Sequence, residues 1–243
     1  MFGLSQPRYA IYFVPNADTD LYRFGAAVLG YDCYSGRDER FLEGADAKAW
    51  SGYVRDPRVY GFHATLKAPF YLASGCREAD LERALTHFAV GQDAVPAGDL
   101  ALRELGAFIA LVPHKASPPL DRLAQSCVSE FDRFRGPMSG QERARRMTPG
   151  LSKRQIENLN RWGYPHVFKD FRFHMTLTGS LPLQKRSKAL RFLGEKFGEK
   201  LGGTKLLVDQ IVISRQNEPS GQFQVIAAAA LTQRQLAPAA YQD

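Results

Sequence analysis

The sequence predicts an α+β protein in which two similar lobes form one domain over residues 1–243. Three observations predict this fold. A strand ending in Val-Pro, a helix, the pentapeptide Phe-His-x-Thr-Leu, a further helix and a strand occur twice in the same order, and such repeats govern a fold assignment. No low-complexity segment or obvious linker separates the halves. The composition, 44% hydrophobic and 23% charged, is that of a globular protein with a sizeable core.

The first lobe is expected at roughly residues 8–98. Its first strand is a β-branched and aromatic run, YAIYFV, closed by Pro15. Asp18 is a suitable N-cap for the helix that follows, because apolar residues recur behind it at helical spacing. In chain order, the expected elements are a strand over residues 9–14, a helix over 18–30, extended chain over 59–72 and a helix over 78–90.

The second lobe is expected at roughly residues 99–232, with a longer connection than the first. This connection contains a basic helical insertion at about residues 138–168, in which Ser152 and Gln155 have the spacing of a capping box. The expected elements are strands over residues 100–105 and 106–113, a helix over 120–134, the insertion, a strand carrying the second pentapeptide, a helix over 184–201, and strands over 205–215 and 222–231.

The charge balance favours anionic partners. Lys and Arg number 32 against 25 Asp and Glu, a net charge of +7, which suits phosphate esters, nucleotides or nucleic acid. The three cysteines, Cys33, Cys76 and Cys127, lack metal-ligand spacing and are interpreted as reduced thiols. No apolar run approaches the roughly 20 residues of a membrane span, and the N-terminus lacks the features of a signal peptide. We therefore expect a cytoplasmic protein that does not bind membranes.

The repeated pentapeptide is the strongest functional signal. It occupies residues 62–66 (FHATL) and 173–177 (FHMTL), and these frames contain two of the five histidines. Residues i and i+2 of a strand share a face. His63 and Thr65 therefore lie on one side, as do His174 and Thr176, while the apolar residues between them face the core. A polar face on a mostly buried strand requires an explanation.

If the two lobes pack about a pseudo-twofold axis, the two frames meet across a cleft. One imidazole can then serve as a base and the other, protonated, as an acid, while the hydroxyls donate to anionic oxygens. This set suits in-line attack on a phosphodiester without a metal, a cofactor or a covalent intermediate. Two alternatives stay open. A single His-Thr pair is often only a satisfied polar pair, and zinc can bind histidines, although no third ligand has suitable spacing.

Further residues are candidates for substrate binding. Lys67 continues the alternation beyond Thr65, and Thr178 is its counterpart in the second frame. Tyr12 lies on the first strand, and Arg215 follows a late strand as a candidate anion contact. Residues 143–161, the most basic part of the chain, are either a solvated surface or a lid over an anionic substrate.

The paired His-x-Thr motifs, 111 residues apart, resemble the signatures of the two-histidine (2H) phosphoesterase superfamily. The segments RYAIYFVP, RVYGFHATLKAPF, LGAFIALVP and WGYPHVFKDFRFHMTLTG resemble a bacterial branch associated with phosphonate-degradation genes. The resemblance implies two antiparallel sheets facing a central cleft with helices outside. It also implies metal-independent hydrolysis of a cyclic phosphodiester by His63, Thr65, His174 and Thr176, and it makes a ribosyl 1,2-cyclic phosphate a candidate substrate.

Two other functions remain as alternatives. The chain could process RNA 2′,3′-cyclic phosphate ends or 2′,5′ bonds, with nucleic acid in place of the small phosphate ester. It could instead be a non-catalytic module that binds a phosphate ligand, although a pure binder has less need of two titratable groups. The sequence leaves open which histidine is the base, which ester bond breaks and what the oligomeric state is.

Overall fold

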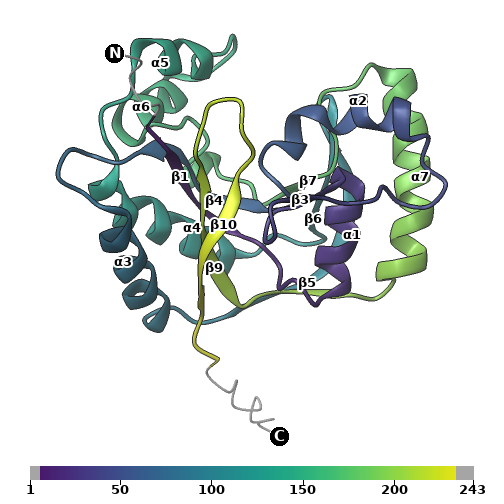
Figure 1. Ribbon diagram of the computed structural model, residues 1–243, viewed down its shortest axis with the longest axis horizontal. Coiled ribbons are helices and arrows are strands. Elements are labelled where there is room, and N and C mark those ends of the chain that lie inside the picture. Colours follow the sequence, from purple (N-terminus) through teal and green to yellow (C-terminus); the bar gives the residue numbers. More distant parts are fainter. Residues whose placement is uncertain (1–5, 234–243) are drawn as a thin grey trace, which may run out of the picture.

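A computed structural model describes residues 6–233 of the chain, which contain both strands and helices (Figure 1). In chain order they are β1 (Arg8–Phe13), α1 (Asp20–Leu29), β2 (Tyr31–Asp32), β3 (Arg37–Asp38), α2 (Ala47–Arg58), β4 (Ala64–Tyr71), α3 (Glu78–Val90), β5 (Val95–Leu105), β6 (Phe108–Pro113), α4 (Pro118–Glu130), the 3₁₀ turn η1 (Phe131–Phe134), α5 (Gly140–Arg146), α6 (Lys153–Trp162), the 3₁₀ turn η2 (Phe168–Asp170), β7 (Met175–Thr176), α7 (Leu183–Leu201), β8 (Lys205–Val208), β9 (Gln210–Gln216) and β10 (Gln224–Ala230).

The α+β class and the antiparallel pairing are confirmed, but the two expected sheets are halves of one. The described strands form an eight-stranded sheet in the order β10-β9-β1-β4-β7-β6-β5-β8, beside a two-stranded sheet of β2 and β3. The halves join where β4 meets β7 through the single pair Ala64–Met175. β4 and β7 carry the repeated pentapeptide, so the centre of the sheet is also the line of symmetry between the repeats.

Each half of the sheet contains a strand from the other repeat. β5 follows the helices of the first repeat but pairs with β6, and β9 follows the second repeat but pairs with β1. The expected boundary at residues 98–99 falls inside β5. β8 and β9, expected as one strand, are separated by Asp209 and lie in opposite halves. A single residue can connect them only because the sheet curls until its two ends approach each other.

The helices cover the outside of this sheet (Figure 1). α3 packs on β9 and β10, and α4 packs on β4. On the other side of the molecule, α7 packs on β5 and β6 and contacts α1, which also contacts α2. The stretch at residues 138–168 contains α5 and α6, which lie together beyond the end of β1 in Figure 1.

Local differences from the expected elements have simple causes. α2 was not expected, because its sequence is polar and its mean hydropathy is low; Asp46 caps it by accepting from the backbone N–H groups of Lys48 and Ala49. β7 is only two residues long. None of the helices within residues 6–233 is long and apolar enough to cross a membrane.

Candidate active site

The two His-x-Thr frames lie side by side on the central strands. β4 and β7 are antiparallel, with Ala64 opposite Met175. Continuing this register by one residue in each direction places His63 opposite Thr176 and Thr65 opposite His174. Directly opposed residues have Cβ atoms about 4.5–5.5 Å apart. All four side chains are partly exposed on one side of the sheet, and Ala64 and Met175 between them are buried. The frames therefore form one square of alternating imidazoles and hydroxyls.

Both histidines are oriented by the same backbone contact. Nδ1 of His63 lies 2.9 Å from the carbonyl oxygen of Gly61, and Nδ1 of His174 lies 2.8 Å from that of Arg172. A carbonyl only accepts, so each Nδ1 carries a proton and donates it. In the neutral ring each Nε2 then has a free lone pair. Nε2 of His63 lies 3.1 Å from the hydroxyl oxygen of Thr65, which can donate to it.

Burial lowers the pKa of both imidazoles. The pKa of His63 falls from 6.5 to about 4, mainly because burial disfavours the imidazolium, with a smaller effect of the nearby His174. Burial also lowers the pKa of His174, and His166 contributes a further lowering. Both rings are therefore neutral at pH 7 in the unliganded protein. An anion bound between them would favour protonation of either ring.

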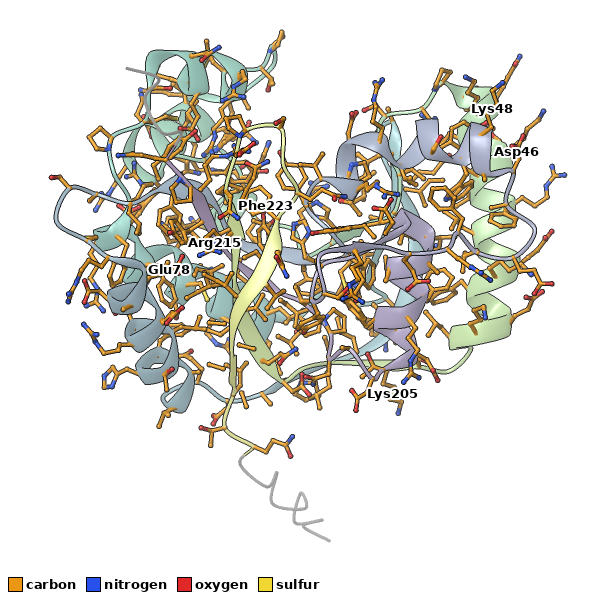
Figure 2. The ribbon with its side chains drawn as sticks, viewed as in Figure 1. Asp46, Lys48, Glu78, Lys205, Arg215 and Phe223 are labelled. Carbon is orange, nitrogen blue, oxygen red and sulfur yellow. The ribbon has the colours of Figure 1, made fainter. Side chains whose placement is uncertain are left out.

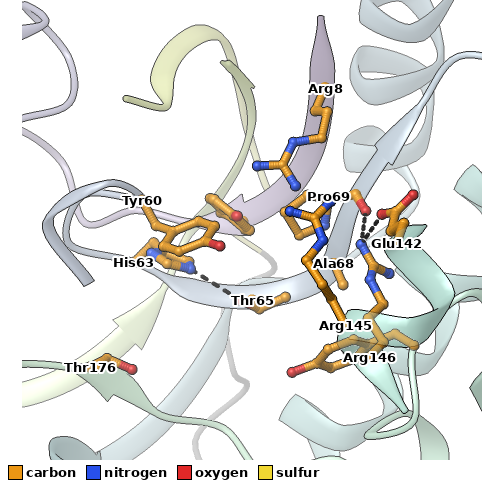
Figure 3. A pocket seen from close by; sticks show the side chains of 12 residues that line it. Arg8, Tyr60, His63, Thr65, Ala68, Pro69, Glu142, Arg145, Arg146 and Thr176 are labelled. Carbon is orange, nitrogen blue, oxygen red and sulfur yellow. Dashed lines mark hydrogen bonds and ion pairs between the residues drawn. The ribbon is translucent and has the colours of Figure 1, made fainter. Parts of the chain in front are cut away.

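A basic cavity of about 410 Å³ opens beside His63 and Thr65 (Figure 3). Its cationic groups are three arginines, against one glutamate. The residues that line it are Arg8, Tyr12, Tyr60, His63, Thr65, Ala68, Pro69, Glu142, Arg145, Arg146, Tyr164 and Thr176. In Figure 3 the side chains of Arg8 and Arg145 point into this space from different elements, β1 and α5. The cavity is therefore suited to an anionic ligand.

Among the four residues expected to bind substrate, Tyr12 lines this cavity. Its ring stacks on His63 with the centroids 3.8 Å apart. Its hydroxyl is buried and has no hydrogen-bond partner among the described residues. A buried polar group without a partner typically costs about 1–3 kcal/mol. The Tyr12 hydroxyl is therefore a hydrogen-bonding group beside the cavity that the described residues leave unused.

Two further cavities adjoin the square. One, of about 740 Å³, lies beside Thr65 and His174, and its basic residues are Arg154, His166, Lys169 and Arg172. The other, of about 280 Å³, lies beside His63 and Thr176. All three cavities border the square of side chains, and together they are called the basin.

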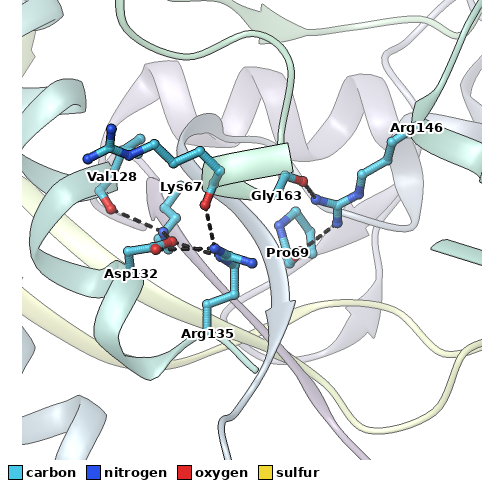
Figure 4. A network of polar contacts seen from close by, with 8 residues as sticks. Lys67, Pro69, Val128, Asp132, Arg135, Arg146 and Gly163 are labelled. Carbon is cyan, nitrogen blue, oxygen red and sulfur yellow. Dashed lines mark hydrogen bonds and ion pairs between the residues drawn. The ribbon is translucent and has the colours of Figure 1, made fainter. Parts of the chain in front are cut away.

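Lys67 lies outside this basin, contrary to the expectation from alternation. The β1–β4 ladder is irregular on either side of Ile11: Tyr12 pairs with Thr65, but Ile11 pairs with Lys67, so Leu66 is an extra residue. Such a bulge turns the following residues to the opposite face. The Lys67 ammonium is buried and donates to Asp132 at 2.9 Å and to the carbonyl oxygen of Val128 at 3.1 Å (Figure 4).

Arg215 also lies away from the cavities. It pairs in register with Tyr9, which faces α3, whereas its neighbour Gln216 pairs with Arg8 on the cavity side. Figure 2 shows Arg215 beside Glu78, and both carboxylate oxygens of Glu78 accept hydrogen bonds from it, at 2.9 and 3.0 Å. It therefore joins β9 to α3, and its charge is already paired.

Thr178 has an intermediate position. It lines the 280 Å³ cavity, but it is buried and its hydroxyl oxygen accepts a hydrogen bond from the backbone N–H of Ile109 at 3.0 Å. This contact attaches the end of the second frame to β6, so a structural role accounts for the residue.

The insertion is held over the basin by arginines that bind backbone carbonyls. Arg146 donates to the carbonyl oxygens of Pro69 and Gly163 (Figure 4) and to Glu142 (Figure 3). Arg135 donates to the carbonyl oxygen of Arg161 at 2.7 Å. These bonds connect α5 and α6 to β4 and η1. The segment expected as a solvated surface or a lid therefore forms a fixed wall of the cavity.

The comparisons with known proteins identify the family. A family model described as "Protein of unknown function (DUF1045)" matches residues 65–224 of the chain. The chain belongs to this family. A relative from Janthinobacterium sp. (strain Marseille), named ribose 1,5-bisphosphate phosphokinase PhnN, is 35% identical over 227 residues, which are 90% of this chain and 49% of that protein. The chain thus spans about half the length of this relative.

This DUF1045 chain has some similarity to solved structures, of which two are examples. One is described as a phosphoesterase, with 15% identity and a TM-score of 0.44. Another is LigT from E. coli in complex with 3′-AMP, with 14% identity and a TM-score of 0.44. In both cases 94% of this chain and 100% of the other chain are covered. At such identities the similarity concerns the fold alone.

Sequence analysis did not assign Tyr60 and Tyr164 to the site, left open whether the face of the first strand that carries Arg8 points inward, and treated Arg145 and Arg146 only as part of a basic segment. Arg8, Tyr60 and Tyr164 reach the basic cavity from three distant segments, and Arg145 and Arg146 come from the insertion. For Arg8 a signal existed: it lies four positions before Tyr12, so both share a face of the strand. The basic run around Arg145 was a weaker signal, because surface helices commonly carry such charges.

Proposed function

We propose that this protein hydrolyses a small cyclic phosphodiester by general acid–base catalysis between His63 and His174, without a metal ion. The observation that carries the proposal is the paired orientation of the two rings. Each Nδ1 donates to the carbonyl oxygen two residues earlier, so each Nε2 carries the lone pair of the neutral ring and can exchange a proton. Thr65 and Thr176 supply hydroxyls beside the two rings.

In the proposed step the phosphate group lies between the four side chains. One Nε2 accepts a proton from a water molecule as its oxygen attacks phosphorus. The other Nε2, protonated beforehand, donates its proton to the ester oxygen as the P–O bond of the ring breaks. The threonine hydroxyls donate to the non-bridging oxygens, on which negative charge increases. The products are a phosphomonoester and a free hydroxyl, and the two rings have exchanged protonation states.

The lowered pKa values of His63 and His174 support a proton transfer that begins only once the substrate is bound. With both rings neutral at pH 7, the acid is missing until an anion enters. An adjacent phosphate charge raises an imidazole pKa, so binding of the substrate itself supplies the protonated ring. Water alone in the cavity would not create this state, which couples proton transfer to occupancy of the site.

A phosphorylated sugar is the proposed substrate class. A cavity of about 410 Å³ fits a small ligand, and its arginines suit phosphate. The name of the relative from Janthinobacterium concerns ribose 1,5-bisphosphate, a sugar phosphate. A ribosyl 1,2-cyclic phosphate, formed during phosphonate breakdown, meets both conditions. Opening its ring would give a ribose carrying a phosphomonoester.

The test measures hydrolysis of ribose 1,2-cyclic phosphate in the presence of EDTA. We expect turnover by the wild type and a loss of about 10²–10⁴-fold in kcat for His63→Ala and for His174→Ala, because each removes one proton-transfer partner. His87→Ala, an exposed site on α3, is the matched control. Full activity in either active-site variant, or abolition of wild-type activity by EDTA, would contradict the proposal. Tight binding without turnover would favour a binding module.

Processing of RNA ends is the second candidate, favoured by the cavity of about 740 Å³ beside His174. Arg154 in this cavity is paired with Asp170, but Lys169 and Arg172 could contact a nucleic-acid backbone. An oligonucleotide ending in a 2′,3′-cyclic phosphate would then be hydrolysed with a higher kcat/KM than the small sugar, and its binding would weaken steeply with salt.

A further inference from the structure

The site is symmetric in its histidines and threonines but asymmetric in its surroundings. Tyr12 pairs with Thr65 on one side, and Ala110 pairs with Thr176 at the equivalent place on the other. The repeated runs RYAIYFVP and GAFIALVP also place Arg8 where the second repeat has Gly106. A large hydroxyl-bearing side chain and a cation are therefore present on one side only. Acid–base chemistry at the square does not require this difference.

The cationic groups on that side are largely unneutralised. Of the three arginines, only Arg146 has a carboxylate partner, Glu142, at 2.5 Å. Arg8 donates through Nε and Nη2 to the side-chain oxygen of Gln216, a neutral amide. Within residues 6–233, Arg145 forms no hydrogen bond or ion pair, yet it lines the cavity. The cavity thus holds two positive charges with no anion to balance them.

Arg8 is also held in place before any ligand binds. Gln216, which fixes its guanidinium, donates to the carbonyl oxygen of Gly221 at 2.7 Å. The guanidinium lies over the ring of Phe223, 5.5 Å from its centroid. These contacts leave Nη1 as a donor that is already oriented. Preorganisation of this kind reduces the entropy lost on binding.

The unpartnered hydroxyl of Tyr12 indicates where a ligand atom belongs. The ring of Tyr12 lies against His63 and lines the same cavity as Arg8 and Arg145, and its buried hydroxyl has no hydrogen-bond partner among the described residues. A phosphate on this side of the cavity would accept from the two guanidinium groups, and a small shift of the Tyr12 ring would add its phenol as a third donor. The cyclic phosphate itself lies between the two histidines, so this position is next to it and distinct from it.

We propose that the side of this cavity lined by Arg8, Arg145 and Tyr12 is a subsite for a second phosphate, so that the substrate is a cyclic phosphodiester that also carries a terminal phosphomonoester. The inference rests on the proposed function, and it assigns Arg8, Arg145 and Tyr12 to the second phosphate. The two-histidine centre opens the ring, while the subsite selects and orients the substrate through its other end.

The experiment compares two probes, ribose 1,2-cyclic phosphate with and without a 5-phosphate. We expect wild-type kcat/KM to be higher for the 5-phosphorylated probe. The ratio between the two probes should fall roughly tenfold to hundredfold in Arg145→Ala, because a charged hydrogen bond to phosphate is lost. Tyr12→Phe, which keeps the ring stacked on His63, should lower the same ratio. Arg143→Ala is the matched control, since it removes the same charge from α5 but does not line the cavity.

Calorimetric binding of ribose 5-phosphate gives a readout that needs no turnover. We expect binding to the wild type and to Arg143→Ala, and roughly tenfold weaker binding to Arg145→Ala. If neither cyclic probe is hydrolysed but this Arg145-dependent binding persists, the proposed function is wrong and the subsite stands. Equal kcat/KM for the two probes, together with no binding of ribose 5-phosphate, would refute the subsite and leave the hydrolysis intact. Preference for an oligonucleotide cyclic phosphate over both probes would also overturn it.

Discussion

At the scale of residues, one backbone carbonyl orients each histidine. Gly61 has a φ of +71°, a conformation that L side chains rarely adopt, and its carbonyl accepts from His63. A Cβ at this position would lie 2.6 Å from Cβ of Cys33. The glycine is therefore required both by its conformation and by the space available. His174 obtains the same orientation from Arg172, without a glycine.

Gly61→Ala is expected to lower both stability and activity. The left-handed conformation costs a non-glycine residue about 1–2 kcal/mol, and the clash with Cys33 adds to this. Gly75→Ala is the control, because Gly75 has a φ of +84° and no atom within 4 Å of its Cβ position. Urea denaturation should show a larger loss of unfolding free energy for Gly61→Ala. Equal losses in the two variants would contradict the role of the clash.

The pKa of His63 predicts a dependence of stability on pH. The folded pKa of about 4 lies below the unfolded value of 6.5, so the unfolded state binds more protons between these values. The free energy of unfolding should therefore fall as the pH decreases from about 6.5 to about 4, by up to about 3 kcal/mol from this residue. Below pH 4 both states are protonated and this contribution levels off.

Urea denaturation at several pH values measures this effect. His63→Gln should flatten the slope between pH 6.5 and 4, since glutamine does not titrate. His87→Gln, an exposed site, should leave the slope as in the wild type. An unchanged slope in His63→Gln would show that His63 is not the group responsible.

At the scale of elements, the bulge in β4 turns Lys67 away from the site, whereas Ala68 and Pro69 beyond it line the basic cavity again. Before Leu66 the strand presents His63 and Thr65 to the basin, and after it Lys67 faces α4. The Lys67 ammonium is tied to Asp132, which also binds Arg135. The same strand thus lines the site and, at Lys67, attaches the helical layer.

Lys67→Met should destabilise the protein without changing substrate selection. Removing the ammonium leaves Asp132 with only Arg135, and we expect a loss of roughly 1–3 kcal/mol in the free energy of unfolding. Values of kcat/KM per folded molecule should match the wild type, because Lys67 does not line a cavity of the basin. Lys188→Met, on the exposed surface of α7, is the control for stability. A tenfold change in kcat/KM would show that Lys67 contributes to the active site.

At the scale of the molecule, the exchange of β5 and β9 makes the two halves interdependent. Each half of the sheet is completed by a strand from the other repeat. The chain beside β5 also contacts the chain after β10, where the backbone N–H of Ala94 donates to the carbonyl oxygen of Thr232 at 2.9 Å. Neither repeat can pair all its strands alone, so we expect the two lobes to unfold as one cooperative unit.

Both halves of the molecule should therefore unfold together in a single transition. The chain has two tryptophans, Trp50 in α2 and Trp162 in α6, and each reports on a different region. Trp162→Phe and Trp50→Phe each leave a single tryptophan. In each variant, the denaturation curve measured by fluorescence should match the curve measured by circular dichroism. Curves that separate into two midpoints would show that the lobes unfold independently.

The sequence predicted well those strands and helices whose formation depends on residues close together in the chain. The strands around residues 9–14 and 106–113 and the helices at 78–90 and 184–201 follow from local periodicity, and the structure confirms them. The capping box at Ser152 is present as well. Predictions that extended alternation past a bulge did not hold, as at Lys67, because one extra residue reverses the face. Arg215 was misplaced because an inward face cannot be distinguished from an outward one without the partner strand.

By itself, the sequence determined the duplicated frame, the alternation that puts each histidine on the same face as its threonine, and the positive charge. These depend on backbone geometry over a few residues. Only the tertiary structure decided that His63 lies opposite Thr176, that Arg8 and Arg145 meet at one cavity, and that Tyr12 ends there without a partner. Such contacts join residues more than a hundred positions apart, and strand register and helix packing establish them as the whole sheet forms.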